Sequence, residues 1–241
     1  MSTQARRLPV YFLVDTSGSM SGDPINQVTS QLNVVIDGLR TNPQALETAH
    51  ICLITFGANA QVDVPLTSLE NFNLPAHLDA AGSTSLGEAL RLLCRTRAAD
   101  LNRKSATSSG DWRPMVFLLS DGEPTDDFDA GLAEFKRQRW GVRIACAVNN
   151  ASEDNLRRFL DNVGAARGTP DETGNLVHIS TSDTMQMQAF FKWVSDSISA
   201  VSNSQDPDGM AGTTPPASTG GSTPPPFPGG NNALPPPPTL S

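Results

Sequence analysis

Short apolar runs, rich in β-branched and aromatic residues, recur along the first 180 positions of this 241-residue chain. They are near-continuous rather than alternating, which is typical of strands covered on both faces. Between them, apolar residues recur at spacings of three and four, the period of an amphipathic helix. Alternating strands and helices predict an α/β fold: a Rossmann-like, doubly wound, mostly parallel sheet with helices on both sides.

The same patterns place the individual elements. Asp23 and Pro24 are expected to start the first helix as a side-chain cap and a first-turn proline, and Thr125 or Asp126 to cap the third. An alternating segment at 61–65, close after Gly57, predicts one antiparallel edge strand. The other strands are expected at 10–14, 51–56, 115–119, 142–148 and 176–179, and the helices at 25–39, 86–101, 128–135, 156–160 and 187–201.

Composition changes abruptly near residue 203. Residues 207–241 hold 11 of the 19 prolines and 6 of the 19 glycines, with a single charge at Asp208. Such a segment cannot bury enough apolar surface to fold, so disorder is expected, with polyproline-II stretches at 224–226 and 235–238. The predicted organisation is an N-terminal extension at 1–7, one folded domain at 8–202 and a disordered tail at 203–241.

Charge and hydropathy argue against two partner classes. The formal net charge is −8, whereas nucleic-acid binding needs a concentrated positive surface. No apolar run approaches the roughly 20 residues that span a bilayer. Arg6 and Arg7 precede an apolar run, but it ends at Asp15 without a small-residue cleavage site, so a cytoplasmic location is expected.

The cysteines predict neither a disulfide framework nor a zinc cluster. There are three, at widely separated positions, and each lies within an apolar run. A thiol in that setting packs as a small buried hydrophobe. We therefore expect Cys52, Cys94 and Cys146 to be buried free thiols.

Polar side chains follow the strands where open α/β sheets bind ligands, outside the carboxyl ends. Residues 15–19 (Asp-Thr-Ser-Gly-Ser) follow the first strand, 120–122 (Ser-Asp-Gly) follow the strand at 115–119, and 82–86 open the second helix. Their carboxylates and hydroxyls form an oxygen-only donor set that suits a hard divalent cation, whose open positions a partner carboxylate could complete. Gly18 is expected to let the first loop turn tightly enough for its serines to face the ion. Singly, each residue is also a common turn or cap residue.

Asp15-x-Ser17-x-Ser19, with Thr84 and Asp121, resembles the metal-ion-dependent adhesion site (MIDAS) of von Willebrand factor type A (vWA) domains. The resemblance covers about residues 8–201, and all five positions carry the family's residue types. It implies a Rossmann-like fold and a non-enzymatic role in protein–protein recognition. It also implies a Mg²⁺ site (or Mn²⁺ or Ca²⁺) in which Ser17, Ser19 and Thr84 supply hydroxyl ligands. Asp15 and Asp121 would bind the ion directly or through water.

Three longer segments, at 13–20, 110–118 and 120–127, are similar to the bacterial TerY subgroup of vWA proteins, which is linked to tellurium resistance. This similarity implies an adaptor in a stress or phospho-signalling system, grouped with a PP2C-type phosphatase and a protein kinase. The proline-rich tail is not part of the family pattern. It is either a ligand for a proline-reading domain or a flexible linker.

Two enzymatic or switch-like alternatives use the same carboxylates. A metal-dependent phosphohydrolase could use Asp15 and Asp121, but Ser17 stands where a second acid would act. No lysine follows the turn at 120–121 or the strand at 142–148, and no Gly-rich phosphate loop ends in Lys-Ser/Thr. A receiver-like switch phosphorylated on Asp15 or Asp121 lacks the same lysine.

Other polar and aromatic residues near these motifs have two interpretations. The acids that follow Asp121 are either helix-start residues favoured by the dipole or a rim that selects a partner. Trp112 is either a packed lid over a sheet end or an exposed recognition residue. The histidines are scattered, which favours structural roles. The residues concerned are Glu123, Asp126, Asp127, Asp129, His50, His77 and His178.

Overall fold

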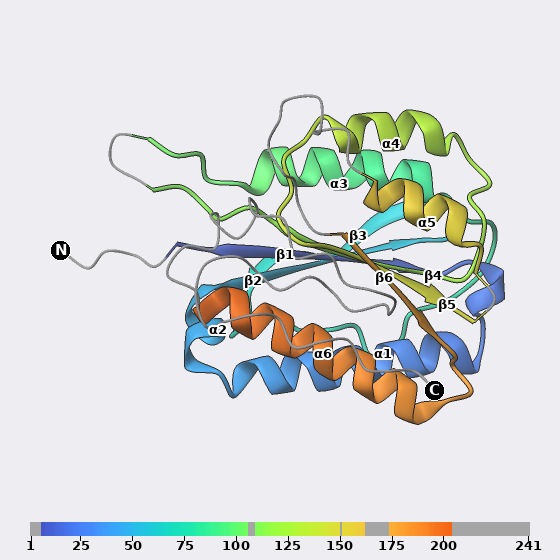
Figure 1. The fold of residues 1–241 in the computed structure, drawn as a ribbon, viewed down its shortest axis with the longest axis horizontal. Helices are drawn as coiled ribbons and strands as arrows, with labels where there is room; N and C mark the ends of the chain where they lie inside the picture. The colour runs from blue at the N-terminus through green and yellow to red at the C-terminus, as the bar shows by residue number, and fades with distance from the viewer. Residues whose placement is uncertain (1–5, 106–108, 150, 162–173, 204–241) are drawn as a thin grey trace, which may run out of the picture.

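The computed structural model describes residues 6–105, 109–149, 151–161 and 174–203. They contain one six-stranded sheet of order β3-β2-β1-β4-β5-β6 (Figure 1). Every neighbouring pair is parallel except β2 and β3. The predicted α/β fold with one antiparallel edge strand is therefore confirmed. The strands are β1 (Leu8–Asp15), β2 (Ala49–Phe56), β3 (Ala60–Ser68), β4 (Met115–Ser120), β5 (Arg143–Val148) and β6 (Gly174–Ile179).

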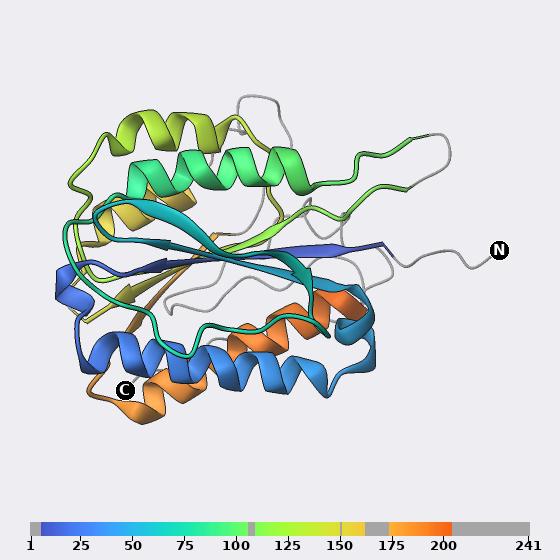
Figure 2. The same ribbon diagram turned by 180° about the vertical axis from the view of Figure 1, so that it is seen from behind.

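Helices cover both faces of the sheet, as Figures 1 and 2 show. One face carries α3 (Leu86–Asp100), α4 (Phe128–Lys136) and α5 (Glu153–Leu160), and the other carries α1 (Asp23–Arg40), α2 (Pro43–Thr48) and α6 (Thr184–Asn203). The apolar core is accordingly divided into two clusters, one on each face. Phe12 and Phe117 stack on the α1 side, with ring centroids 5.1 Å apart. Burial on both faces explains why the strands are apolar at nearly every position.

The parallel strands all end at one edge of the sheet, on the right in Figure 1, which we call the carboxyl edge. Asp15 is the last residue of β1 and Ser120 the last of β4. These are central, adjacent strands, so the chain segments that follow them emerge side by side. The sheet order thus brings the motifs at 15–19 and 120–122 together.

Two helix starts differ from the prediction. Asp23 does not cap α1: it is the first helical residue, and Gly22 is the N-cap with φ of 82°, a conformation that glycine adopts without strain. Helix α4 is capped by neither Thr125 nor Asp126. Its N-cap is Asp127, whose carboxylate accepts a hydrogen bond from the Ala130 amide at 3.1 Å.

Two short elements were not predicted. A 3-10 turn, η1 (Gly18–Met20), follows β1, and α2 begins after Asn42, whose side chain caps it. Both are too short to show a helical period in the sequence. The three cysteines are buried and free, as expected. The domain limits of 8–202 stay a prediction, and residues 1–5 and the tail from 204, with both polyproline stretches, lie outside the described residues.

Candidate functional site

Asp15 lies at the base of the site and is fully buried. One carboxylate oxygen accepts a hydrogen bond from the Ser17 amide at 2.8 Å. The other accepts one from the Ser120 hydroxyl at 2.6 Å, so the last residues of β1 and β4 are joined side chain to side chain. These bonds hold the carboxylate in one orientation at the carboxyl edge.

Three side-chain oxygens above Asp15 form a short chain of contacts. The hydroxyl oxygens of Ser17 and Ser19 are 3.0 Å apart, and the Ser19 hydroxyl donates to Asp121 Oδ1 at 2.7 Å. Ser17 is buried whereas Ser19 is exposed, so the chain leads from the interior to the surface. The 3-10 turn η1 turns the serines toward each other and toward Asp121.

The role predicted for Gly18 is only partly right. Gly18 has no positive φ; the positive-φ glycine here is Gly82, at φ of 81°. The Gly18 amide donates to the Gly82 carbonyl at 2.9 Å, and a Cβ on Gly18 would lie 3.3 Å from that oxygen. Glycine at this position favours the close approach of the two loops, which brings the Thr84 loop beside the two serines.

Thr84 is buried just before α3 and lies beside the loop that carries Asp121. A Cβ on Gly122 would lie 3.2 Å from Thr84 Oγ1 and 3.9 Å from Ser19 Oγ. The Thr84 amide donates to the Thr125 hydroxyl at 3.1 Å, and the Thr125 amide donates to the Thr84 carbonyl at 2.9 Å. The structure therefore brings together all five residues singled out in the sequence: Asp15, Ser17, Ser19, Thr84 and Asp121.

Asp126 has a role that the sequence patterns did not indicate. Its carboxylate accepts hydrogen bonds from the Gly87 amide at 2.9 Å and the Glu88 amide at 2.7 Å, the second and third residues of α3. It thus caps α3, although it lies in the loop before α4. Ser85, the N-cap of α3, makes no side-chain cap bond, so the first turn of α3 depends on a cap from outside.

The neighbouring acids divide between the two interpretations. Asp126 and Asp127 cap helices, and Asp129 pairs with Arg158, so these three have structural partners. Glu123 is exposed beside Asp121 and keeps the interpretation of a rim residue.

Trp112 and the histidines lie outside the five-residue site. Trp112 is buried three residues before β4, at the end of the strands opposite the site. The Arg6 guanidinium lies 5.6 Å from its ring centre, which favours the packing interpretation. His178 Nε2 lies 2.8 Å from Glu153, and His50 Nδ1 lies 3.1 Å from the Thr48 carbonyl.

Burial raises the pKa of the Asp15 carboxyl. Hydrogen bonds from Ser120 and Ser17 oppose this shift, and the nearby charge of Asp121 adds to it. Burial dominates because an ionised carboxylate loses its hydration there. A positive charge close to Asp15 and Asp121 would relieve both the desolvation cost and the repulsion.

The spacing and chemistry of the oxygens fit a small divalent cation. In an octahedral Mg²⁺ shell, neighbouring oxygens lie about 3 Å apart, since each is about 2.1 Å from the ion. The Ser17–Ser19 and Ser19–Asp121 separations are 3.0 and 2.7 Å. Within the described residues, no three His, Cys, Asp or Glu side chains gather as a metal-binding group. The five-residue site differs from such a group because it combines two carboxylates with three hydroxyls.

A family model described as the von Willebrand factor type A domain matches residues 10–192. Among curated proteins, the chain is 26% identical over 201 residues to inter-alpha-trypsin inhibitor heavy chain H4 of Homo sapiens, covering 78% of this chain and 20% of the relative. It is 30% identical over 123 residues to the Bos taurus protein, covering 48% and 13%. The chain thus spans a fifth or less of the length of these relatives.

Solved structures share the fold. A von Willebrand factor type A protein from Catenulispora acidiphila matches with a TM-score of 0.57 and 16% identity, over 81% of this chain and 43% of that one. The pilus adhesin SpaC from Lactobacillus rhamnosus GG matches with a TM-score of 0.60 and 13% identity, over 81% and 31%. None of the helices in the described residues is long and apolar enough to cross a membrane.

With three quarters of its length matched by the family model, this chain belongs to the von Willebrand factor type A domain family.

Proposed function

We propose that this protein is an adaptor that binds a protein partner through a divalent cation held in a MIDAS-type site. The family is often involved in protein–protein interaction, which supports the general role. Asp15, Ser17, Ser19, Thr84 and Asp121 would hold Mg²⁺, or Mn²⁺ or Ca²⁺ in its place. The cation would supply a positive charge that attracts an acidic side chain of the partner.

The convergence of hydroxyl and carboxylate oxygens at the carboxyl edge carries this proposal. Ser17, Ser19 and Asp121 come from two loops that are 102 residues apart, yet their oxygens lie at the separations that neighbouring ligands of one small ion adopt. Ser19 is exposed and Asp121 half-buried, so the outer side of the site is open to a partner. Asp15, buried and hydrogen-bonded, would supply charge from below.

The cellular setting is proposed on sequence similarity. The segments at 13–20, 110–118 and 120–127 resemble the TerY subgroup, which supports a role in a bacterial stress, tellurium-resistance or phospho-signalling system. A PP2C-type phosphatase and a protein kinase are the partners to examine first, in the cytoplasm. The inter-alpha-trypsin inhibitor relatives support the domain family alone, because the match covers a small part of their length.

Calorimetric titration of the full chain with Mg²⁺, Mn²⁺ and Ca²⁺ tests the metal site. We expect one site per chain that is lost in Asp15→Ala and weakened at least about ten-fold in Ser17→Ala, because each removes an oxygen ligand. Ser21→Ala is the matched control: its hydroxyl donates to the Ala80 carbonyl, outside the five-residue set. Equal affinities for wild type, Ser17→Ala and Ser21→Ala would show that the cation binds elsewhere.

Capture of partners on the immobilised protein, with Mg²⁺ or with chelator, tests the adaptor role. We expect the phosphatase or kinase to be retained by wild type with Mg²⁺ and lost with chelator or in Asp15→Ala. Retention that is unaffected by chelator and by Asp15→Ala would overturn the proposal. Phosphoester turnover that disappears in Asp15→Ala would favour the phosphohydrolase alternative instead.

A further inference from the structure

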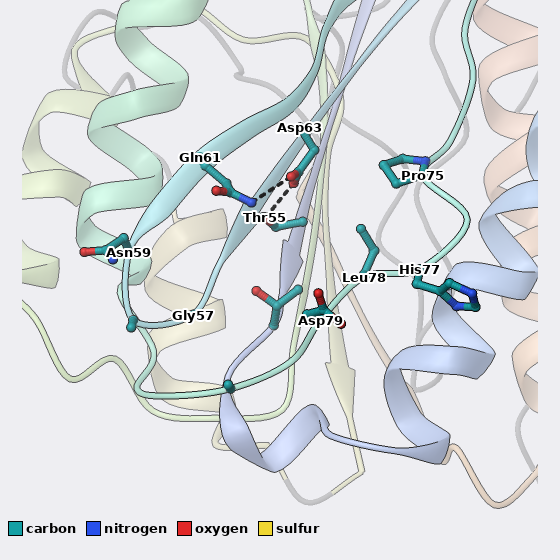
Figure 3. Close-up of a pocket in the computed structure, with 12 residues that line it drawn as sticks. Thr55, Gly57, Asn59, Gln61, Asp63, Pro75, His77, Leu78 and Asp79 are labelled. Carbon is teal, nitrogen blue, oxygen red and sulfur yellow. Dashed lines mark hydrogen bonds between the residues drawn. The ribbon is translucent and has the colours of Figure 1, made fainter.

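A cavity of about 300 Å³ lies next to the five-residue site, on the α1 side of the sheet (Figure 3). Its walls come from the facing ends of β2 and β3, from Thr16 directly after β1, and from residues 75–81 of the segment between β3 and α3. Thr16 stands between Asp15 and Ser17, so the cavity and the proposed cation site share a wall. None of the cavity's own polar side chains belongs to the five-residue set.

The strand ends that line the cavity are polar where the rest of that face is apolar. Further along β2 the same face presents Ile51 and Leu53 to the core. At the cavity it presents Thr55, which is 4% exposed and donates to Asp63 Oδ2 at 2.5 Å. The Gln61 side-chain amide donates from Nε2 to Asp63 Oδ1 at 2.8 Å, and Figure 3 shows both bonds. A carboxylate is thus held at the cavity wall by two neighbours that β2 and β3 provide.

Thr16 adds an uncommitted hydroxyl to the cavity wall. It is 7% exposed and lines the cavity, and its hydroxyl makes no hydrogen bond to any described residue. Its backbone groups are already engaged: the amide donates to the Phe56 carbonyl and the carbonyl accepts from the Ala81 amide, both at 2.8 Å. The Thr16 hydroxyl is therefore available to a polar group that enters the cavity, and such a group would gain a hydrogen bond there.

The charge of the cavity is negative. Its carboxylates are Asp63 and Asp79, its one ionisable base is the exposed His77, and no lysine or arginine lines it. Asp79, exposed on the loop, has no hydrogen-bond or ion-pair partner among the described residues. The volume exceeds that of a bare metal ion, and the described residues contain no metal-type group of three His, Cys, Asp or Glu. An elongated organic cation fits the space, the charge and the unused hydroxyl.

We propose that this cavity receives the ammonium or guanidinium group of a lysine or arginine side chain of the docked partner. Asp63 and Asp79 would neutralise the cation, and Thr16 would accept a hydrogen bond from it. The shared wall places this basic side chain beside the acidic group that the cation site would bind, so the partner would present an acid and a base close together. That the organic cation comes from a docked partner rests on the proposed function, but the binding of an organic cation in the cavity does not.

Amide NMR of the full chain tests the site with capped single residues: Nα-acetyl-lysine N-methylamide, its arginine analogue, and the norleucine analogue as a neutral control. The titrations are run in chelator and again with Mg²⁺. We expect the two cationic probes to bind at millimolar concentration and to shift the signals of residues 16, 59–61 and 79. Asp63→Asn and Asp79→Asn should each weaken binding at least about five-fold, because each removes a charge that contacts the cation. Thr16→Val, of similar shape, should weaken it about three-fold.

The controls separate the cavity from general surface charge. Glu70→Gln removes an exposed acid of the same connecting segment that does not line the cavity, and we expect it to leave the affinities unchanged. Asp79→Asn disrupts no interaction within the described residues, so its result stays informative if Asp63→Asn destabilises the fold. If the wild-type protein binds the cationic probes but not Mg²⁺, the proposed metal site is refuted while the cavity is still shown to bind an organic cation.

Other outcomes overturn the proposal. Equal binding of the norleucine probe would make the cavity merely apolar, and no shift with either cationic probe would leave it without this ligand class. Displacement of the probes by Ca²⁺ from the same signals would assign an inorganic ion. A free diamine such as cadaverine that binds at least ten-fold more tightly than the lysine probe would support the cation chemistry but overturn the partner side chain as its source.

Discussion

Asp126 offers a sharp test of how the site is held together. Its carboxylate, 21% exposed, receives the amides of Gly87 and Glu88 at the first turn of α3. Loss of a side-chain cap costs about 0.5–2 kcal/mol, and loss of a negative charge at a helix N-terminus costs a further 0.3–1 kcal/mol or so. Asp126→Ala should therefore lower the free energy of unfolding by about 1–3 kcal/mol. Asp126→Asn, which keeps one acceptor oxygen, should lower it by roughly half as much.

Urea denaturation of the metal-free protein, followed by fluorescence, measures this change. Asp129→Ala is the matched control, because it removes an acid of the same segment whose side chain is 77% exposed and pairs with Arg158 at the surface. An exposed pair of this kind is worth about 0–1 kcal/mol. A loss in Asp126→Ala no larger than that in Asp129→Ala would refute the capping role.

The same variant tests the link between packing and the proposed cation site. Thr84 stands two residues before α3, and its loop is fixed by the segment that carries Asp126. If Thr84 helps to hold a cation, Asp126→Ala should weaken Mg²⁺ binding by roughly ten-fold, as other outer partners of metal ligands do. An unchanged Mg²⁺ affinity in a destabilised Asp126→Ala protein would separate the fold of α3 from the cation site.

Three further predictions concern burial and close packing. Because burial raises the pKa of Asp15, its contribution to stability is present at acidic pH and is lost as the pH rises through the raised folded-state value. Metal-free Asp15→Asn should thus gain stability relative to wild type as the pH rises above about 4 in urea titrations. A pH-independent difference would contradict this. Gly131→Ala should lower the free energy of unfolding by about 1–3 kcal/mol or more, because the added Cβ would lie 2.2 Å from the Gly87 carbonyl oxygen. The control Gly38→Ala should lower it little, because its Cβ would meet only a side-chain oxygen at 3.3 Å. Similar melting temperatures for the two variants would refute the close contact. Burial raises the pKa of all three cysteine thiols, so the native protein should react slowly with a thiol reagent. The unfolded protein should react with three equivalents of the reagent, and rapid labelling of the native protein would contradict the prediction.

The strands and most helices could be predicted because their signals are local. The apolar runs of β1, β2, β4 and β5 mark strands buried on both faces, and the three–four spacing of α1 and α6 marks one apolar face. The start of α1 was misassigned because an Asp-Pro pair occurs both at the N-cap and in the first turn of helices. In the structure Gly22, with φ of 82°, is the N-cap, and Asp23 begins the first turn.

The candidate site was found for a similar reason. In a parallel sheet the carboxyl ends of the strands lie at one edge, so a polar motif after each strand predicts that Asp15 and Asp121 share that edge. They are neighbours because the sheet order places β1 next to β4. Thr84 followed from its place before α3 and from the family resemblance. The 2.7 Å contact of Ser19 with Asp121 and the close approach of Gly18 to Gly82 depend on how the loops settle.

Other features have no local signal at all. Asp126 caps a helix that begins some 40 residues earlier, and Gly87 meets Gly131 because α3 and α4 pack closely. The acidic cavity joins Thr16, Asp63 and Asp79 from three separate segments. Periodicity and strand-end motifs are properties of a few consecutive residues, so the chain alone predicted the layers of the fold and the edge that carries the candidate site. The packing of whole elements decides which distant carboxylate caps a helix and which polar groups line a cavity. Only the tertiary structure shows these two features.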